Sequence, residues 1–141
     1  CKVKILSLAG CNLSNSDYLK FGHLINLKYL NLSDNLLCDM NNVLINGFGS
    51  LQILHLQCNS FTDINLYADA IINSNLNKIK FESNYIVNID KIINSINENN
   101  YNLKDIDFTN NNIAMVPTLH KTDINIILIE NPVVEYLETQ Q

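Results

Sequence analysis

The sequence predicts an α/β fold of the solenoid type, in which short strands stack into one parallel sheet and mixed helical and irregular segments return behind it. Three observations lead to this prediction. An eleven-residue pattern of apolar positions occurs six times along the chain. Each copy has one residue, usually asparagine, at its ninth position, and successive copies lie 20 to 27 residues apart. Periods in this range are typical of stacked supersecondary units.

The pattern is clearest in residues 27–37, which read LKYLNLSDNLL. Leucine occupies the first, fourth, sixth and eleventh positions of this segment, and Asn35 occupies the ninth. The other copies place leucine, isoleucine, valine or phenylalanine at the same positions. The sixth copy is degenerate, because Asp123 stands where an apolar residue belongs. The ninth-position residues are Cys11, Asn35, Asn59, Asn84, Asn111 and Asn131.

The alternation in the middle of each copy explains how the pattern becomes structure. Successive side chains of a strand point to opposite faces, so the fourth and sixth positions of a copy point to one side together. One copy cannot bury these side chains alone, and stacked neighbours are needed to form a continuous core. We expect the Asn59 side chain to turn inward as well and to bond backbone groups of the loop. The leucines expected to be among the most buried residues are Leu30, Leu32, Leu54 and Leu56.

The segments behind the sheet are predicted to differ between copies. Residues 63–74 and 88–97 carry apolar residues at helical spacing, so both are predicted to contain helix. Asp63 is a possible N-cap of the first of them. Residues 16–23 form a third, shorter candidate helix. Pro117 lies in the short connection between the fifth and sixth copies, where we expect no helix.

The whole chain resembles the leucine-rich-repeat superfamily of the intracellular type, because residues 27–37 match its pattern L-x-x-L-x-L-x-x-N-x-L at every fixed position. The resemblance implies a single domain over residues 1–141 with about six repeats, wound as a right-handed, horseshoe-shaped solenoid with the sheet on its concave side. Residues 3–8, 29–35 and 81–86 are also similar to the repeat domain of tubulin-folding cofactor E. The spliceosomal U2 A′ protein, dynein light chain 1 and regulators of phosphatase-1 are similar at the same level, and all of these proteins act by binding.

The two ends of the chain are expected to differ. The first copy begins at Val3 with no capping segment before it, and a terminal repeat needs a polar capping face. We therefore expect the chain to be a fragment, or a partner or further segment to cover this edge. At the other end Pro132 ends the last copy. The residues expected to fold over the core there as a cap are Val133, Val134, Tyr136 and Leu137.

Composition and charge argue against several classes of function. The chain has 141 residues, of which 47% are hydrophobic and 16% charged, and its net charge is −5 with no arginine. A nucleic-acid surface needs clustered lysine and arginine to neutralise phosphates, so direct nucleic-acid contact is not expected. The four cysteines form no CxxC pair, and we expect reduced thiols in a cytoplasmic or nuclear protein. No apolar run is long enough for a membrane span.

The titratable residues form no recognisable catalytic constellation. His23, His55 and His120 each stand alone in the sequence, and spacing assigns no nucleophile or carboxylate to them. Asp105 and Asp107 are two residues apart in one predicted strand and so face the same side. Paired carboxylates of this kind do acid–base work, hold a metal ion or are simply solvated. We interpret them as solvated acids and expect no catalytic activity, no cofactor and no metal.

The concave face of the predicted sheet is the candidate binding surface. Ile5, Tyr29 and Ile53 hold equivalent outward positions in the first three copies, and an apolar row with a polar rim is typical of a protein-binding patch. Strand propensity alone is the other explanation for these residues. The next copies place lysines beside aspartates, which either pair with one another or contact a partner. The residues predicted to bind a partner protein are Ile5, Tyr29, Asn31, Ile53, His55, Lys78, Lys80, Asp105 and Asp107.

These observations predict an intracellular protein–protein interaction module, or adaptor, that binds another protein through its concave face. The alternative is a subunit of a larger assembly, either a ribonucleoprotein of the U2 A′ type that acts through protein contacts or a complex of the tubulin-folding-cofactor type. A basic cluster would favour the ribonucleoprotein, and the sequence has none.

Overall fold

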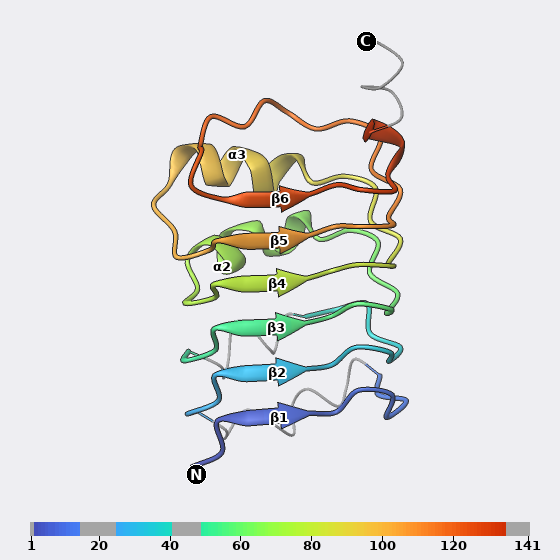
Figure 1. Cartoon of the computed structure of the whole chain (residues 1–141), viewed down its shortest axis with the longest axis vertical. Helices are drawn as coiled ribbons and strands as arrows, with labels where there is room; N and C mark the ends of the chain where they lie inside the picture. Colours follow the sequence, from blue (N-terminus) through green and yellow to red (C-terminus); the bar gives the residue numbers. More distant parts are fainter. Residues whose placement is uncertain (1, 15–24, 41–48, 135–141) are drawn as a thin grey trace.

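A computed structural model describes residues 2–14, 25–40 and 49–134 of the chain. Within these ranges six short strands form one open sheet, in which every neighbouring pair is parallel and the strands follow one another in sequence order. Figure 1 shows the stack, and the predicted α/β class with a parallel sheet is confirmed. The strands are β1 (Ile5–Ser7), β2 (Tyr29–Asn31), β3 (Ile53–His55), β4 (Lys78–Lys80), β5 (Asp105–Asp107) and β6 (Asn125–Ile127).

The strands pair in the register that aligns the copies of the sequence pattern. Leu30 of β2 pairs with Leu6 of β1 and with Leu54 of β3, and the same correspondence continues to β6. The middle residues of β2 and β3 face the core, since Leu30 and Leu54 are 1% and 0% exposed. Leu32 and Leu56, two residues further along, are also fully buried. The prediction for these four leucines is therefore confirmed.

Buried asparagines tie each strand to the one before it. The Nδ2 group of Asn59 donates to the carbonyls of Leu32 at 3.0 Å and Leu56 at 3.2 Å, and its Oδ1 accepts the N–H of Leu37 at 2.9 Å. An amide side chain suits this place because it carries donors and an acceptor together. The inward direction predicted for Asn59 is confirmed. Equivalent bonds are made by Asn35, Asn84, Asn111 and Asn131.

The residue before each ninth position has a left-handed backbone, which the sequence analysis did not predict. The φ angle is 56° at Asp34 and 59° at Glu130. This conformation continues the ladder beyond the strand, because the N–H of Asp34 donates to the carbonyl of Gln57 at 3.0 Å. A left-handed residue other than glycine costs roughly 1–2 kcal/mol, so the stacked structure imposes it. The residues at this position are Gly10, Asp34, Cys58, Ser83, Asn110 and Glu130.

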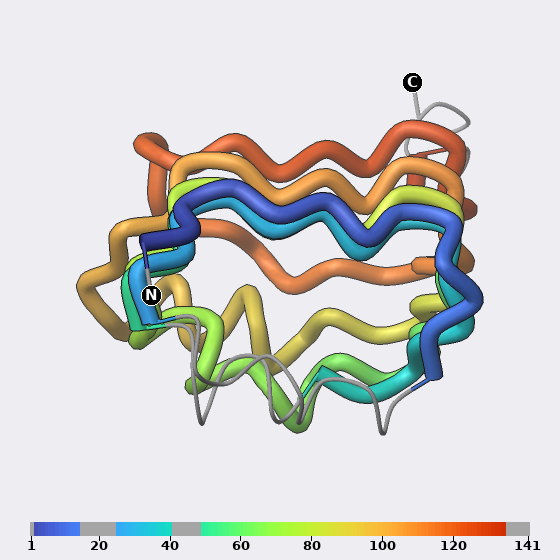
Figure 2. Tube along the Cα trace, turned by 90° about the horizontal axis from the view of Figure 1, so that it is seen from below, coloured from blue at the N-terminus to red at the C-terminus, as the bar shows by residue number. Residues whose placement is uncertain are grey.

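The returning segments form a second layer that covers one face of the sheet, as Figure 2 shows. Residues 63–74 contain the 3-10 helix η2 (Asn65–Tyr67) and the α-helix α2 (Ala68–Ile72), so helix in this segment is confirmed. The prediction that Asp63 is the N-cap is wrong, because η2 begins later and Ile64 precedes it. The Asp63 carboxylate instead accepts the N–H of Asn65 at 3.0 Å.

The second predicted helix is α3 (Asp90–Glu98), which begins and ends slightly later than residues 88–97. Its apolar side faces the core, where Ile92, Ile93 and Ile96 are completely buried. The connection between β5 and β6 contains no helix, as predicted. Residues 16–23 lie outside the described residues. None of the helices in the described ranges is long and apolar enough to cross a membrane.

Aromatic and aliphatic side chains fill the space between the two layers. Phe81 and Phe108 directly follow β4 and β5 at equivalent positions, and their rings stack with centroids 5.7 Å apart. In the sixth copy Ile124 enters the core, at 9% exposure, in place of Asp123. The Asp123 carboxylate accepts a hydrogen bond from the Tyr101 hydroxyl at 2.5 Å. A shift of one residue therefore supplies the apolar side chain that the pattern lacks at this point.

The core is less completely covered at the β1 end of the stack than in its middle. Leu6 and Leu8 are only partly buried, whereas the equivalent leucines of the second copy are fully buried. At the β6 end Val133 is 6% exposed and Val134 packs against the core, as predicted for the cap. Tyr136 and Leu137 lie outside the described residues.

Candidate functional site

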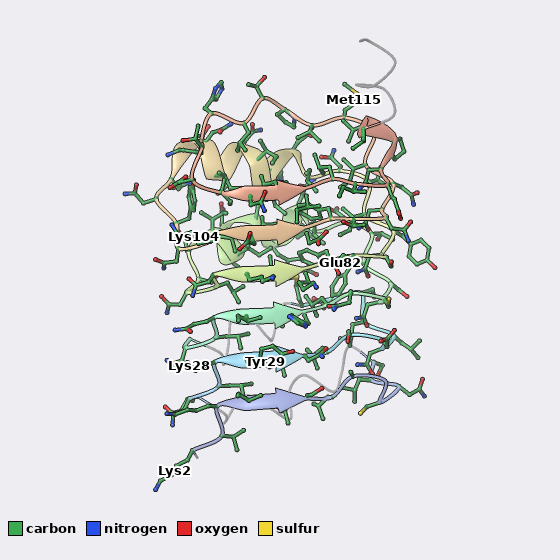
Figure 3. All side chains as sticks on the ribbon, viewed as in Figure 1. Lys2, Lys28, Tyr29, Glu82, Lys104 and Met115 are labelled. Carbon is green, nitrogen blue, oxygen red and sulfur yellow. The ribbon has the colours of Figure 1, made fainter. Side chains whose placement is uncertain are left out.

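The face of the sheet opposite the helices is the candidate site, and we call it the outer face. The middle residue of each strand points into the core, so the first and third residues point to the outer face. Figure 3 shows this face, with Tyr29 on β2. Column one contains the first residues Ile5, Tyr29, Ile53, Lys78, Asp105 and Asn125. Column two contains the third residues Ser7, Asn31, His55, Lys80, Asp107 and Ile127.

All nine residues predicted to bind a partner lie in these two columns. The three apolar ones are register neighbours, since Ile5 pairs with Tyr29 and Tyr29 pairs with Ile53. We call them the apolar ridge. Ile5 is 71% exposed, and the other two are partly buried. The ridge is therefore contiguous and reaches solvent at its β1 end.

Tyr29 leans across the sheet onto His55. The Tyr29 hydroxyl lies 3.3 Å from His55 Nδ1, and the two rings meet edge to face with centroids 5.1 Å apart. His55, which stands alone in the sequence, therefore has an aromatic neighbour in the structure. Diagonal neighbours on adjacent strands are within reach of aromatic side chains. The signal was present in the alignment of the copies, because His55 lies two residues after the register partner of Tyr29.

The sequence leaves two explanations for the lysines and aspartates of the outer face: pairing with one another or contact with a partner. The first of these, pairing across adjacent strands, is not observed in the part of the chain that the structure describes. Lys80 Nζ instead lies 3.4 Å from Glu82 Oε2, which is two residues further along the same segment. Among the described residues, neither Lys78 nor Lys80 forms an ion pair with Asp105 or Asp107. Asp105 accepts a hydrogen bond from the side chain of its register neighbour in β6 at 3.3 Å.

The side chains of Asn31 and Asp107 form hydrogen bonds that stabilise the turn after their own strands. Each turns its Oδ1 toward the residue two positions later. Asn31 accepts the hydroxyl of Ser33 at 2.7 Å and its N–H at 3.0 Å. Asp107 makes the same pair of bonds to Thr109, at 2.6 and 2.9 Å. These contacts fix the chain as it leaves the strand, so of the predicted residues these two are the least available to a partner.

Two pKa shifts mark the centre of the outer face. Partial burial lowers the pKa of His55 below its usual 6.5, and the positive charges of Lys80 and Lys78 lower it further. Burial also raises the pKa of Glu82, and the negative charge of Asp107 adds to this effect while Lys80 opposes it. His55 is consequently held in its neutral form at neutral pH, which suits its contact with the Tyr29 hydroxyl.

Gln57 and Glu82 are polar residues of this face that the prediction of binding residues omitted. They follow β3 and β4 at equivalent positions, and the N–H of Cys58 donates to the carbonyl of Glu82 beside them. The Oε1 atoms of both side chains are buried, and within the described part of the chain neither has a hydrogen-bond partner. A buried polar atom without a hydrogen-bond partner lowers the free energy of unfolding, so a substitution of Glu82 should change stability measurably.

Other side chains that carry chemistry are dispersed. Cys11 and Cys58 are exposed thiols. Partial desolvation of the Cys58 thiol, together with the charge of Asp34, raises the pKa of Cys58, which disfavours the reactive thiolate. His120 is exposed on the connection to β6, and His23 lies outside the described residues. In the described ranges no three His, Cys, Asp or Glu side chains come together in a way that would hold a metal ion.

Comparisons with known proteins assign no family to the chain. It matches no protein-family model and no curated protein.

Proposed function

We propose that the chain is a leucine-rich-repeat solenoid that binds another protein through its outer face, and that it acts as a binding module rather than as an enzyme. Support for the solenoid comes from the strands, which pair at equivalent positions of the sequence pattern, and from the buried asparagine that recurs beside them. In a solenoid each unit contacts only its neighbours, and the sheet lines a surface that is open to a partner.

The apolar ridge is the observation that carries the proposal. Strand propensity alone does not account for it, because the same column continues with Lys78, Asp105 and Asn125 in the same strand geometry. The position therefore tolerates polar residues, and apolar ones in three successive strands need another reason. Contact with a partner is such a reason, since tyrosine and large aliphatic residues supply buried area at the centre of protein interfaces.

Tyr29→Ala tests the proposal, with Leu66→Ala as the matched control. Leu66 is 76% exposed in η2, on the opposite layer, so each variant removes one large side chain from a different face of the molecule. Proteins from an extract of the source organism that are retained by the wild-type chain are purified and titrated against all three proteins. We expect Tyr29→Ala to weaken binding by more than about 1 kcal/mol and Leu66→Ala to leave it unchanged.

Thermal melting of the three proteins is the control for folding, because Tyr29→Ala also removes the contact with His55. Equal affinity of Tyr29→Ala and the wild type, with weaker binding by Leu66→Ala, would place the binding surface on the helical layer and refute the proposal.

A further inference from the structure

Column one changes its chemistry in a fixed order along the stack. The apolar ridge covers β1 to β3, a lysine follows on β4 and an aspartate on β5. Neighbouring strands lie about 4.8 Å apart, so the five positions extend over about 19 Å. A partner that contacts the whole column must present three apolar groups and two charges of opposite sign at this spacing.

Lys78 and Asp105 are the charges that are available to a partner. Lys80 is engaged by Glu82. Asp107 Oδ1 accepts two bonds from Thr109, at 2.6 and 2.9 Å, whereas Asp105 accepts one bond, at 3.3 Å. Lys78 is exposed and, within the described residues, forms no ion pair. Asp105 keeps one oxygen beyond its bond to β6. An acidic group opposite Lys78 and a basic group opposite Asp105 would complement the face, and complementary charge fixes the orientation of a partner.

The spacing of the strands distinguishes between the backbones that a partner could use. An α-helix places side chains on one face about every 5.4 Å, so four turns advance about 22 Å. This differs from the column by about 2–3 Å, which side chains can accommodate. An extended strand places side chains on one face every 6.6–6.8 Å and advances about 27 Å over four such steps, which is about 8 Å out of register. A polyproline helix, with three residues per turn of about 3.1 Å each, deviates further.

The width of the outer face is consistent with a helix. Columns one and two are separated by two residues of a strand, which is about 6.6 Å. A helix with its side chains is about 10–12 Å in diameter and therefore covers both columns. It would bury the apolar ridge while the Tyr29 hydroxyl keeps its contact with His55.

We propose, on the basis of the function proposed above, that the partner lays an α-helix across strands β1 to β5. This helix presents an apolar residue on each of three successive turns, an acidic residue on the fourth and a basic residue on the next. The acidic residue faces Lys78 and the basic residue faces Asp105. Read from β1 to β5, this order is the same whichever direction the helix runs, and along the peptide it is reversed when the helix runs from β5 to β1.

A displayed library of peptides about 20 residues long tests the proposal. One half of the library has a helix-favouring background and varies the residues of one helical face, and the other half has an extended, β-branched background with every second residue varied. The library is selected on the wild-type chain and on the double variant Lys78→Glu/Asp105→Lys. The double variant Lys91→Glu/Asp69→Lys, which makes the same exchange of charge on α2 and α3, is the matched control.

We expect the wild-type chain and the control to select helical peptides with the apolar, acidic and basic order. The variant of Lys78 and Asp105 should select the same apolar residues with the two charges interchanged. Circular dichroism should show that the selected peptides gain helix on binding, and Tyr29→Ala should weaken them at least about fivefold.

Two results would overturn the proposal of a helical partner: selection of extended peptides, or an order of charges that does not invert with Lys78→Glu/Asp105→Lys. Either result would leave the proposed function intact, provided that binding still depends on Tyr29. Selected peptides that bind equally well to Tyr29→Ala would overturn both. A library that yields no binder for the wild-type chain would also count against the helix.

Discussion

Replacing Asn59 with alanine removes an amide that contacts three backbone carbonyls and one backbone N–H. The carbonyls keep a second donor after the substitution. Leu32 is still bonded by Asn35, and Leu56 is still bonded by Asn84. The third carbonyl, that of Gln57, keeps the backbone N–H of Asp34 as a donor. The cost of the substitution is therefore not the sum of four lost bonds.

The N–H of Leu37 determines the magnitude. Leu37 is 0% exposed, and among the described residues Asn59 Oδ1 is its acceptor. A buried donor left unpaired costs about 1–3 kcal/mol, so Asn59→Ala should lower the free energy of unfolding by that amount. Asn35→Ala is the matched control. Its Oδ1 accepts the N–H groups of Cys11, which is exposed, and of Leu13, which is partly buried, so a smaller loss is expected than for a fully buried donor.

Equilibrium unfolding in urea, followed by circular dichroism, measures both variants. The midpoints should shift while the dependence of the free energy on urea stays the same, because neither substitution changes the surface exposed on unfolding. A loss for Asn59→Ala that is no larger than that for Asn35→Ala, or that is below about 0.5 kcal/mol, would refute the reasoning from the unpaired N–H.

Three further predictions follow from the core, the turns and the outer face. Leu54→Ala should lower the free energy of unfolding by about 2–5 kcal/mol, since Leu54 is completely buried, and a loss typical of a surface site would contradict its place in the core. Glu130 has a φ of 59°, so Glu130→Gly should raise the free energy of unfolding by up to about 1 kcal/mol and Glu130→Val should lower it. The opposite order of stability in urea unfolding would argue against a left-handed backbone imposed by the fold. The pKa of Glu82 is raised in the fold, so protonation of this carboxyl favours the folded state. This contribution to the free energy of unfolding is fully present below the usual pKa of 4.5 and is lost as the pH rises through the raised pKa. The difference in urea midpoint should therefore move in favour of Glu82→Gln as the pH increases, and a difference that is independent of pH would show that the carboxyl is not perturbed.

The sheet and the buried asparagines could be predicted because they depend on periodicity. Leu30 and Leu54 fall at equivalent places in the pattern, and once the copies are aligned the register of parallel strands follows. The degenerate sixth copy shows the limit of this reasoning. Asp123 has a hydroxyl partner at the surface, and the next residue turns inward, which spacing alone does not reveal.

The details of the outer face could be predicted only in part. The columns follow from alternation, but the direction in which each long side chain leans depends on its rotamer and its neighbours. Tyr29 leans toward His55, and Lys80 bends back to Glu82 instead of crossing to the next strand. The left-handed position was missed for another reason. Cys58 does not favour this conformation, and the pattern has no residue type in common there.

The asparagines have a consequence for how the chain comes apart. The carbonyls of Leu32, Leu56, Phe81 and Phe108 each accept two amides, one from their own copy and one from the next. Loss of an outer copy thus leaves each of these carbonyls with one donor still in place, so fraying is expected to proceed from the ends in steps. Amide hydrogen exchange should be slowest at Phe61 and Ile86, whose N–H groups donate to Asn84 and Asn111 in the middle of the stack, and faster toward both ends. The apolar ridge lies at the β1 end, where the core is less completely covered, so a bound partner should slow exchange in copies that open early.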